Sequence, residues 1–282
     1  MTFFYIILTV LAIIIILFFV AVNNFKNPHV SNEKNPLSVG IEFEINKIPS
    51  LNSKKLNSWW ISNENSNTSI ILMHGWGKNA ARLLPYIKNL NFYKYNILAF
   101  DSRNHGDSDK DKYSSMIKFS EDISSCIDFL KKEKKESAEN IYLIGLSIGG
   151  AASIYAAAND DRINKIVTVG APSNPADVMK LHLLKKKIPN FIISMVFKYL
   201  EIKVGKKFDE ICAANNINRT RAKTLLVHGT LDRVVPVEQG ELIYSKADKH
   251  NVDLWNIDGK GHSNCHYEKG YWKKLLDFFN EQ

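Results

Sequence analysis

A serine between two glycines stands in the pattern GLSIG at residues 145–149. The apolar run 141–144 comes directly before this pattern, and a helix-like segment, 148–158, follows the serine. Small residues between a strand and a helix permit a sharp turn that exposes the central serine at the carboxyl end of the strand. The alternative is a glycine-rich turn whose serine only caps the helix. The strand–turn–helix context favours Ser147 as a nucleophile.

A serine hydroxyl needs a base to remove its proton, and the base needs a carboxylate to orient it. Both residue types follow Ser147, the acid first and the histidine second. Asp232 comes after the apolar run 223–229, and His262 lies in a glycine-flanked loop after the last apolar run. The order Ser, Asp, His is typical of triads assembled at the carboxyl ends of parallel strands.

Other roles for these residues stay open. Asp258 is a second candidate for the acid, but it lies only four residues before His262 and reaches the far side of the ring with difficulty. Asp232 could be a turn aspartate, and His262 a surface or capping histidine. His262 and His266 have the spacing of a metal-binding pair, yet no H-E-x-x-H pattern or third ligand is near. We expect a triad with no metal and no cofactor.

The pattern HGWG at residues 74–77 follows the apolar run 69–73. An attacked carbonyl develops negative charge on its oxygen, and backbone N–H groups aimed at that oxygen stabilise it. We expect the two donors to be the N–H of Trp76 and the N–H of Ile148, the residue after the serine. His74 is interpreted as a buried turn residue, because this chemistry uses the backbone and not the imidazole ring.

Short apolar runs alternate with helix-like segments from residue 69 onward. Runs that are apolar on both faces, with helices between them, indicate a parallel sheet covered on each side, a doubly wound α/β domain. The expected strands are 69–75, 96–101, 140–145, 165–170, 223–229 and 252–258, and the expected helices are 79–90, 116–133, 148–158, 237–247 and 267–279. Two earlier runs, 39–46 and 55–62, predict an antiparallel opening pair with its turn at Pro49 and Ser50.

About fifty residues, 171–222, separate two of the expected strands, which is too long for a structureless loop in a compact domain. The segment contains the helical run 191–202, so we interpret it as a helical cap, where substrate selection would lie. Residues 176–223 hold eleven lysines and arginines against four acids, which is most of the net charge of +8. This composition predicts contact with an anionic surface or, alternatively, a solvated lysine face.

Residues 3–22 form a run of twenty positions in which only Thr9 is polar. This is about the length of helix that crosses a hydrocarbon core of ~30 Å, so we predict a transmembrane anchor. The alternative is a cleaved signal peptide, whose apolar region is usually about 7–15 residues long and follows positive charges that are absent here. Residues 23–36, with several Asn and Pro, are expected to form a linker that holds the body, residues 37–282, off the bilayer.

Composition excludes several classes of protein. A hydrophobic content of 45% with 23% charged residues is typical of a packed globular chain and excludes disorder as the main state. Cys126, Cys212 and Cys265 are too scattered for a disulfide framework or a zinc site and agree with a reducing compartment. Lys26 and Lys34 follow the apolar run, which favours a cytoplasmic body. No nucleic-acid partner is expected, because the basic segment has no recognition motif.

Five features in order resemble the α/β-hydrolase superfamily, and within it the lipase, esterase and serine-aminopeptidase-like group. They are HGWG at 74–77, DSRNHGDS at 101–108, GLSIGG at 145–150, Asp232 and His262. The resemblance runs from about residue 55 to the C-terminus. It implies an α/β-hydrolase fold and a Ser-His-Asp triad, but it does not define the substrate.

One position departs from the family pattern. Asn104 stands where relatives more often carry glycine, and Asn tolerates the left-handed backbone that such a turn needs. Our main hypothesis is therefore a membrane-anchored serine hydrolase that cleaves esters or thioesters, including lipid-like substrates. The alternatives are a peptidase or amidase with the same triad, and a binding module without activity.

Overall fold

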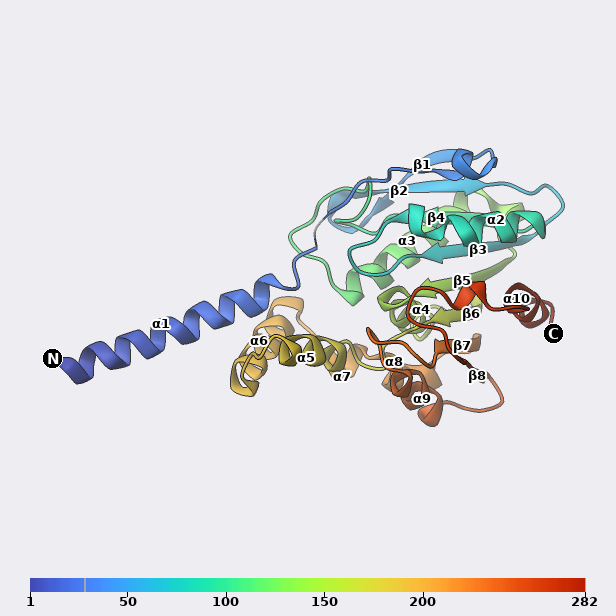
Figure 1. Cartoon of the computed structure of the whole chain (residues 1–282). Coiled ribbons are helices and arrows are strands. Elements are labelled where there is room, and N and C mark those ends of the chain that lie inside the picture. Colours follow the sequence, from blue (N-terminus) through green and yellow to red (C-terminus); the bar gives the residue numbers. More distant parts are fainter. Residues whose placement is uncertain (28, 282) are drawn as a thin grey trace.

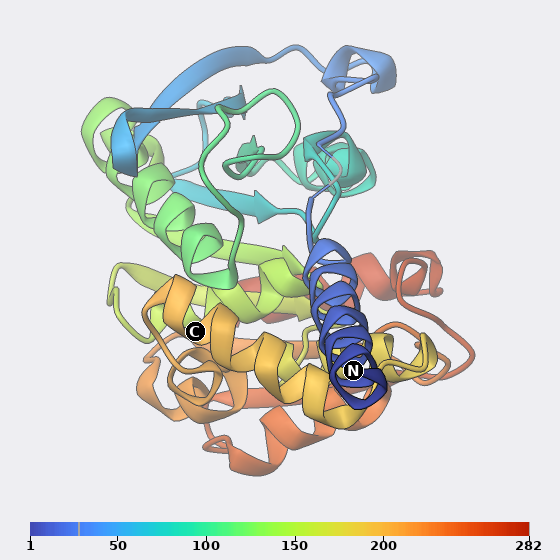
Figure 2. The ribbon, with the colours of Figure 1, turned by 90° about the vertical axis from the view of Figure 1, so that its left-hand side faces the viewer.

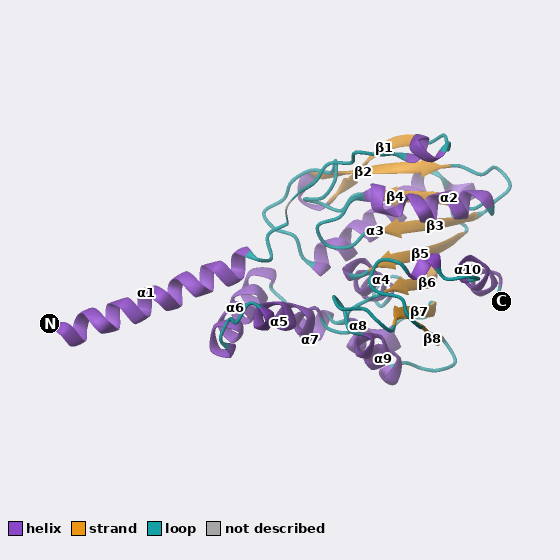
Figure 3. Cartoon of the chain, viewed as in Figure 1, coloured by secondary structure: helices purple, strands orange, loops and turns teal. Residues whose placement is uncertain are grey.

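The computed structural model describes residues 1–27 and 29–281. An eight-stranded sheet with the order β1-β2-β4-β3-β5-β6-β7-β8 forms its centre (Figures 1 and 3). Strands β3 to β8 run parallel, whereas β1 and β2 are antiparallel to their neighbours. The strands are β1 Glu44–Ser50, β2 Lys54–Ile61, β3 Thr68–Met73, β4 Asn96–Phe100, β5 Asn140–Leu146, β6 Ile163–Val169, β7 Lys223–Gly229 and β8 Val252–Ile257. The predicted doubly wound, mostly parallel sheet is confirmed.

Two layers of helices bury the faces of the sheet. Helices α3, α4, α8 and α9 pack on one face, and α2 and α10 pack on the other. The α-helices are α1 Thr2–Asn23, α2 Leu84–Phe92, α3 Met116–Glu133, α4 Ile148–Ala157, α5 Pro175–Lys185, α6 Asn190–Val204, α7 Phe208–Ile211, α8 Ala213–Asn216, α9 Val237–Lys246 and α10 Tyr271–Asn280. Short 3-10 helices lie at Pro36–Val39, Leu51–Ser53, Ala80–Leu83, Lys135–Ser137, Ile217–Arg219 and Cys265–Tyr267.

The opening antiparallel pair is present, but its turn lies later than the sequence predicts. Pro49 and Ser50 belong to β1, and the chain reverses at Leu51–Ser53, where Asn52 has a φ of 59°. β1 is the edge strand of the sheet, where the missing N–H of a proline is tolerated. Asn adopts left-handed turn positions more readily than most residues, so the turn forms there instead.

Two helices begin later than predicted. The segment expected to start a helix at residue 79 forms a 3-10 turn first, and α2 begins at Leu84, followed by Pro85 in its first turn. The last helix begins at Tyr271, because the residue before it, Gly270, has a φ of 84°. That left-handed residue separates α10 from the short 3-10 turn at Cys265–Tyr267.

The cap segment, residues 171–222, holds helices α5 to α8 between β6 and β7. Its two longer helices, α5 and α6, lie beside the sheet near the end of α1 (Figure 1). Leu183, Ile192, Ile193 and Val196 of these helices form a small apolar cluster of their own with Ala21 of α1. The cap therefore packs against the N-terminal helix as well as against the body.

Helix α1 projects away from the body (Figure 1). In the described part of the chain it is the one helix that is long and apolar enough to cross a membrane, judged by length and composition. Most of its side chains are exposed, but Ile14, Leu17, Phe18, Ala21 and Val22 form a shielded stripe that packs against the cap. The described contacts of α1 with the rest of the molecule thus begin at Ile14, in the C-terminal half of the helix.

The segment after α1, expected to be a linker away from the body, is instead attached to it. We call residues 24–27 and 29–35 the strap. The side-chain amide of Asn32 in the strap donates to the Asp101 carboxylate at 2.6 Å, and Oδ1 of the same amide accepts the N–H of Ala81 at 3.0 Å. Asn79 donates to two strap carbonyls at 3.1 and 3.0 Å. Short amide side chains thus give this Asn-rich segment partners on the body.

Candidate active site

Ser147 lies at the junction of β5 and α4, directly before the first residue of the helix. Its backbone has a φ of 55° and a ψ of −125°, which residues with a side chain rarely adopt. The turn is tight, because a Cβ on Gly145 would lie 2.4 Å from the carbonyl oxygen of Gly149. A Cβ on Gly149 would lie 2.6 Å from the carbonyl oxygen of His74. Glycine at both positions allows the turn that presents Ser147 at the edge of the sheet.

Asp232 and His262 come from the loops after β7 and β8 and are in contact. The distance from His262 Nδ1 to Asp232 Oδ2 is 2.7 Å. The carboxylate is buried, and its Oδ1 accepts the N–H groups of Val234 and Val235, each at 2.9 Å. These bonds fix the carboxylate in a position from which it orients the imidazole ring.

The alternative acid, Asp258, faces another group. Its Oδ1 accepts the hydroxyl of Thr230 at 3.0 Å. On the other side of Asp232 lies His228, whose Nε2 is 3.6 Å from Asp232 Oδ2 and 2.8 Å from the carbonyl oxygen of Val235. Burial lowers the pKa of His228, so at neutral pH this ring is uncharged and donates to Val235. Of the two candidate acids, Asp232 is the one positioned to serve His262.

Ser147 and His262 both line one cavity of about 980 Å³. In the described part of the chain no hydrogen bond joins the hydroxyl to the imidazole ring. Such bonds are often long in an enzyme without substrate and shorten when substrate binds. Gly170 leaves room for the pair of side chains, because a Cβ there would lie 3.1 Å from His262 Nδ1 and 3.2 Å from Asp232 Oδ2.

The two expected oxyanion donors lie at the same cavity. Ile148 is the first residue of α4, so its N–H has no acceptor within the helix. Trp76 lies in the HGWG turn after β3, and among the described residues its N–H has no backbone acceptor. A Cβ on Gly75 would lie 3.2 Å from Ser147 Cβ, so this turn passes directly beside the serine.

His74 has a structural role in this turn. Its Nε2 accepts the N–H of Ser102 at 3.1 Å, and its Nδ1 lies 2.8 Å from the carbonyl oxygen of Gly75. Burial lowers the pKa of His74 to about 4, so the ring is neutral at pH 7 and Nδ1 donates. The imidazole therefore joins the HGWG turn to the end of β4.

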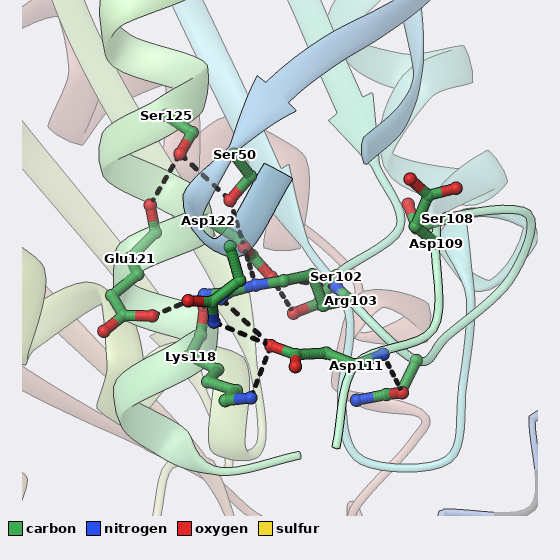
Figure 4. A network of polar contacts seen from close by, with 12 residues as sticks. Ser50, Ser102, Arg103, Ser108, Asp109, Asp111, Lys118, Glu121, Asp122 and Ser125 are labelled. Atoms are coloured by element: carbon green, nitrogen blue, oxygen red, sulfur yellow. Dashed lines mark hydrogen bonds and ion pairs between the residues drawn. The ribbon is translucent and has the colours of Figure 1, made fainter. Parts of the chain in front are cut away.

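A buried charged network holds the loop that follows β4 (Figure 4). Arg103 Nε donates to the Asp122 carboxylate of α3 at 2.6 Å, and its Nη2 donates to Glu121 at 2.5 Å. Asp122 also accepts the hydroxyls of Ser102 at 2.5 Å and Ser50 at 2.9 Å. Because residues 110–115 of this loop line the cavity, the network fixes one cavity wall.

The charge of the cavity lining is strongly positive. Its basic side chains are Lys26, Lys78, Arg82, Lys110, Lys112, Lys203 and Lys206, whereas its acidic ones are Asp111 and Glu201. Both acids are engaged, since Asp111 binds Lys118 and Glu201 accepts the N–H of Phe208 at 3.0 Å. The charged side chains that line the cavity are therefore mostly basic, and both acids already have partners in the protein.

A family model for the serine aminopeptidases, S33, matches residues 64–217, more than half of the chain. The chain belongs to this family. An esterase of Pyrococcus furiosus has a related structure, with a TM-score of 0.73 at 28% identity over 90% of this chain and 97% of the esterase. The family and this likeness confirm the predicted α/β-hydrolase fold.

Two curated relatives are more distant in sequence. An alpha/beta hydrolase domain-containing protein of Caenorhabditis elegans is 22% identical over 222 residues, which cover 77% of this chain. The match covers 58% of the nematode protein, so the chain spans less than two thirds of that relative. An uncharacterized membrane protein of Saccharomyces cerevisiae is 22% identical over 259 residues, covering 88% of this chain and 83% of the yeast protein.

Sequence reasoning missed the contribution of the strap to the cavity. Phe25, Asn27 and His29 line it, and the amide of Asn27 donates to the carbonyl of Asn104. Asn104 has a φ of 67°, the left-handed conformation expected at this departure from the family pattern. The concentration of Asn between residues 23 and 36 was the available signal, because such side chains bind backbone groups as readily as they form loops.

Proposed function

We propose that the chain is a membrane-anchored serine hydrolase that cleaves carboxylic ester or thioester bonds through an acyl-enzyme. The observation that carries the proposal is Ser147 on its strained turn, in one cavity with a histidine that is hydrogen-bonded to a buried aspartate. Strain of this kind persists at sites where the surrounding structure enforces it for a function.

The proposed roles follow from the arrangement. Ser147 Oγ attacks the carbonyl carbon while His262 takes its proton, and Asp232 stabilises the resulting imidazolium through Nδ1. The N–H groups of Trp76 and Ile148 hold the oxyanion. His262 then gives the proton to the leaving alcohol or thiol. A water molecule, activated by His262, attacks the acyl-enzyme and releases the acid and free Ser147.

The charge of the cavity favours esters over peptides with a free amino terminus. An aminopeptidase must hold an ammonium group, and a carboxylate near the nucleophile is the partner of complementary charge for it. Asp111 and Glu201 are engaged with groups of the protein itself, and the other charged lining residues are basic. Like charges therefore oppose a cationic substrate, whereas neutral or anionic acyl substrates meet no such penalty.

The orientation in the membrane is part of the proposal. Lys26 and Lys34 follow α1, and the positive-inside rule assigns such a flank to the cytoplasm. We expect the body to be cytoplasmic and its partners to be the membrane and a small-molecule or lipid-like ester. In intact spheroplasts, an impermeant thiol reagent should fail to reach an exposed Ser245→Cys until the cytoplasmic membrane is permeabilised.

The substrate class is tested with the full chain in detergent micelles. Turnover is measured on p-nitrophenyl esters of increasing acyl length and on aminoacyl p-nitroanilides, with Ser147→Ala as the control. We expect hydrolysis of the esters, none in the control, and at least 100-fold lower kcat/KM on the anilides. Faster cleavage of the anilides would make the chain a peptidase and overturn the proposal.

A further inference from the structure

Helix α6 is apolar on two faces. Ile192, Ile193 and Val196 are buried against α1 and α5. The side chains at the opposite positions are exposed and are also largely apolar: Phe191, Met195, Tyr199 and Ile202. A surface helix in water normally has one apolar stripe and a polar face opposite it. The four apolar side chains stand beside exposed Ser194, Lys198 and Lys203, a mixture that is typical of a helix at the boundary between lipid and water.

The contact of α6 with α1 fixes the depth of α6 relative to the anchor. The part of α1 that is free of the cap, residues 2–13, spans only about 18 Å at 1.5 Å per residue, well short of a hydrocarbon core of ~30 Å. To cross the whole hydrocarbon core, α1 must therefore also use the part between Ile14 and Val22. This is the part against which the cap packs. The ring of Phe18 lies 5.6 Å from the ring of Tyr199 on α6. If α1 crosses the bilayer, α6 must share its depth.

Lysines mark the level of the headgroups. The amine of Lys186 donates to the side chain of Asn24, directly after α1 ends. Lys185, Lys186 and Lys187 precede α6, and Lys206 and Lys207 follow it. Lysines on both sides of an apolar helix can hold it at an anionic surface by attraction to the lipid headgroups. Lys198, which lies on the exposed face, is long enough to extend its amine to the same level.

Figure 2, viewed from the side toward which α1 projects, shows α6 running across α1 and not along it. A helix in this position lies in the plane of the membrane when α1 crosses that membrane. The cavity reaches this place, because its lining includes Val22 of the stripe, Phe25 after α1, Met179 of α5, and Leu200 and Val204 of α6, together with Ser147.

From these observations we propose that α6 is embedded in the leaflet nearest the body and that the cavity takes its acyl substrate sideways from that leaflet. The substrate is then a membrane-resident acyl lipid, whose chain passes between α1, α5 and α6 to Ser147 without crossing water. This inference rests on the proposed hydrolase function for its substrate, whereas the position of α6 is independent of catalysis. The occupant of the exposed face of α6 is the lipid of that leaflet.

The position of α6 is tested on the full chain in nanodiscs with anionic lipid. Single spin labels are placed through Met195→Cys and Ile202→Cys, with Leu242→Cys on α9 as the control. The exposed fraction of Leu242, 40%, is close to that of Met195, 46%, and the three native cysteines are buried. We expect collisions with oxygen to exceed those with a water-soluble nickel complex at the two α6 sites, and the reverse at Leu242. Preference for the nickel complex at both α6 sites would overturn the proposal.

Acidic substitutions on the exposed face of α6 test whether the substrate enters from the leaflet. Met195 and Ile202 do not line the cavity, so the double variant Met195→Asp/Ile202→Asp should keep kcat/KM on a soluble p-nitrophenyl butyrate within about twofold. On a fluorogenic acyl lipid embedded in the nanodisc we expect at least a tenfold loss, and no loss for Leu242→Asp. Unchanged cleavage of the embedded lipid would contradict entry from the leaflet.

The two hypotheses fail in different ways. If the wild-type chain cleaves neither ester, the proposed function is wrong, and the spin-label result still decides where α6 lies. If the double variant loses activity on both esters, folding is impaired. Lateral entry is then decided by Met195→Gln/Ile202→Gln, for which the same selective loss is expected.

Discussion

Ser147 adopts a backbone conformation that costs on the order of 1–3 kcal/mol for a residue with a side chain. Its neighbours in the sequence compensate, because glycines at 145 and 149 allow β5 and α4 to approach closely. Asp232 and His262, far from Ser147 in the sequence, come to the same edge of the sheet from the ends of two further parallel strands. At the residue scale the account therefore rests on a few side chains with separate roles, and each role has its own test.

The first test separates the two candidate acids. Asp232→Asn should lower kcat by about 10⁴-fold, because an amide favours the wrong tautomer of His262. Asp258→Asn should change kcat less than about threefold, since Asp258 binds the hydroxyl of Thr230. Steady-state rates on a p-nitrophenyl ester measure both effects. The opposite ranking of the two variants would assign the acid to Asp258.

His74 predicts a pH dependence of stability. Its pKa in the folded protein is about 4, below its ordinary value of 6.5, because the ring is buried. Between pH 4 and pH 6.5 the histidine is protonated in the unfolded chain but not in the folded protein. The free energy of unfolding is therefore highest above pH 6.5 and decreases as the pH falls toward 4. The loss is on the order of 3 kcal/mol for this group. Thermal unfolding in micelles should therefore show a smaller decrease in Tm from pH 7 to 4.5 for His74→Gln than for wild type. An equal decrease would remove His74 as the cause.

At the scale of elements, the junction of β5 with α4 determines where Ser147, the proposed nucleophile, lies. Gly145→Ala would place a Cβ 2.4 Å from a backbone oxygen, which cannot move as a side chain can. We expect the free energy of unfolding to fall by about 3 kcal/mol or more, which is the upper end of the usual cost of overpacking. Gly261→Ala is the control, since its nearest atom would be 3.5 Å away. Comparable Tm values for the two variants would show that the turn is looser than described.

The strands and the places of Ser147, Asp232 and His262 at their ends could be predicted from the sequence because the signals are local. Each buried parallel strand is an apolar run, and each active-site residue follows such a run in a glycine-containing loop. The turn after β1 and the start of α10 were less predictable. They depend on which of several suitable residues adopts a left-handed backbone, and tertiary packing selected Asn52 and Gly270.

At the scale of the molecule, α1, the strap and the cap are in contact with one another and contribute residues to the lining of the cavity. This could not be predicted from the sequence, because the contacts join segments that are far apart in it, as between Asn32 and Asp101. An Asn-rich segment has the same composition as a loop. Only the presence of matching donors and acceptors on the body distinguishes a strap from a flexible linker.

Asn32→Ala tests the strap. The variant loses its hydrogen bonds to Asp101, Asp107 and Ala81, and it leaves the buried Asp101 carboxylate with fewer donors. We expect a loss of about 1–3 kcal/mol in unfolding free energy, measured in micelles, and faster proteolysis within the strap. Exposed Asn251→Ala should change neither quantity. A strap that is cleaved equally fast in wild type and variant would be a flexible linker after all.

The central claim is that Ser147 is a nucleophile activated by His262. Its most direct test is to treat the full chain in micelles with a fluorophosphonate and to locate the adduct by mass spectrometry of the peptides. The account predicts one adduct, on Ser147, that is absent from a folded Ser147→Ala variant and forms far more slowly in His262→Ala. An adduct on another residue, or undiminished labelling of Ser147→Ala, would contradict it.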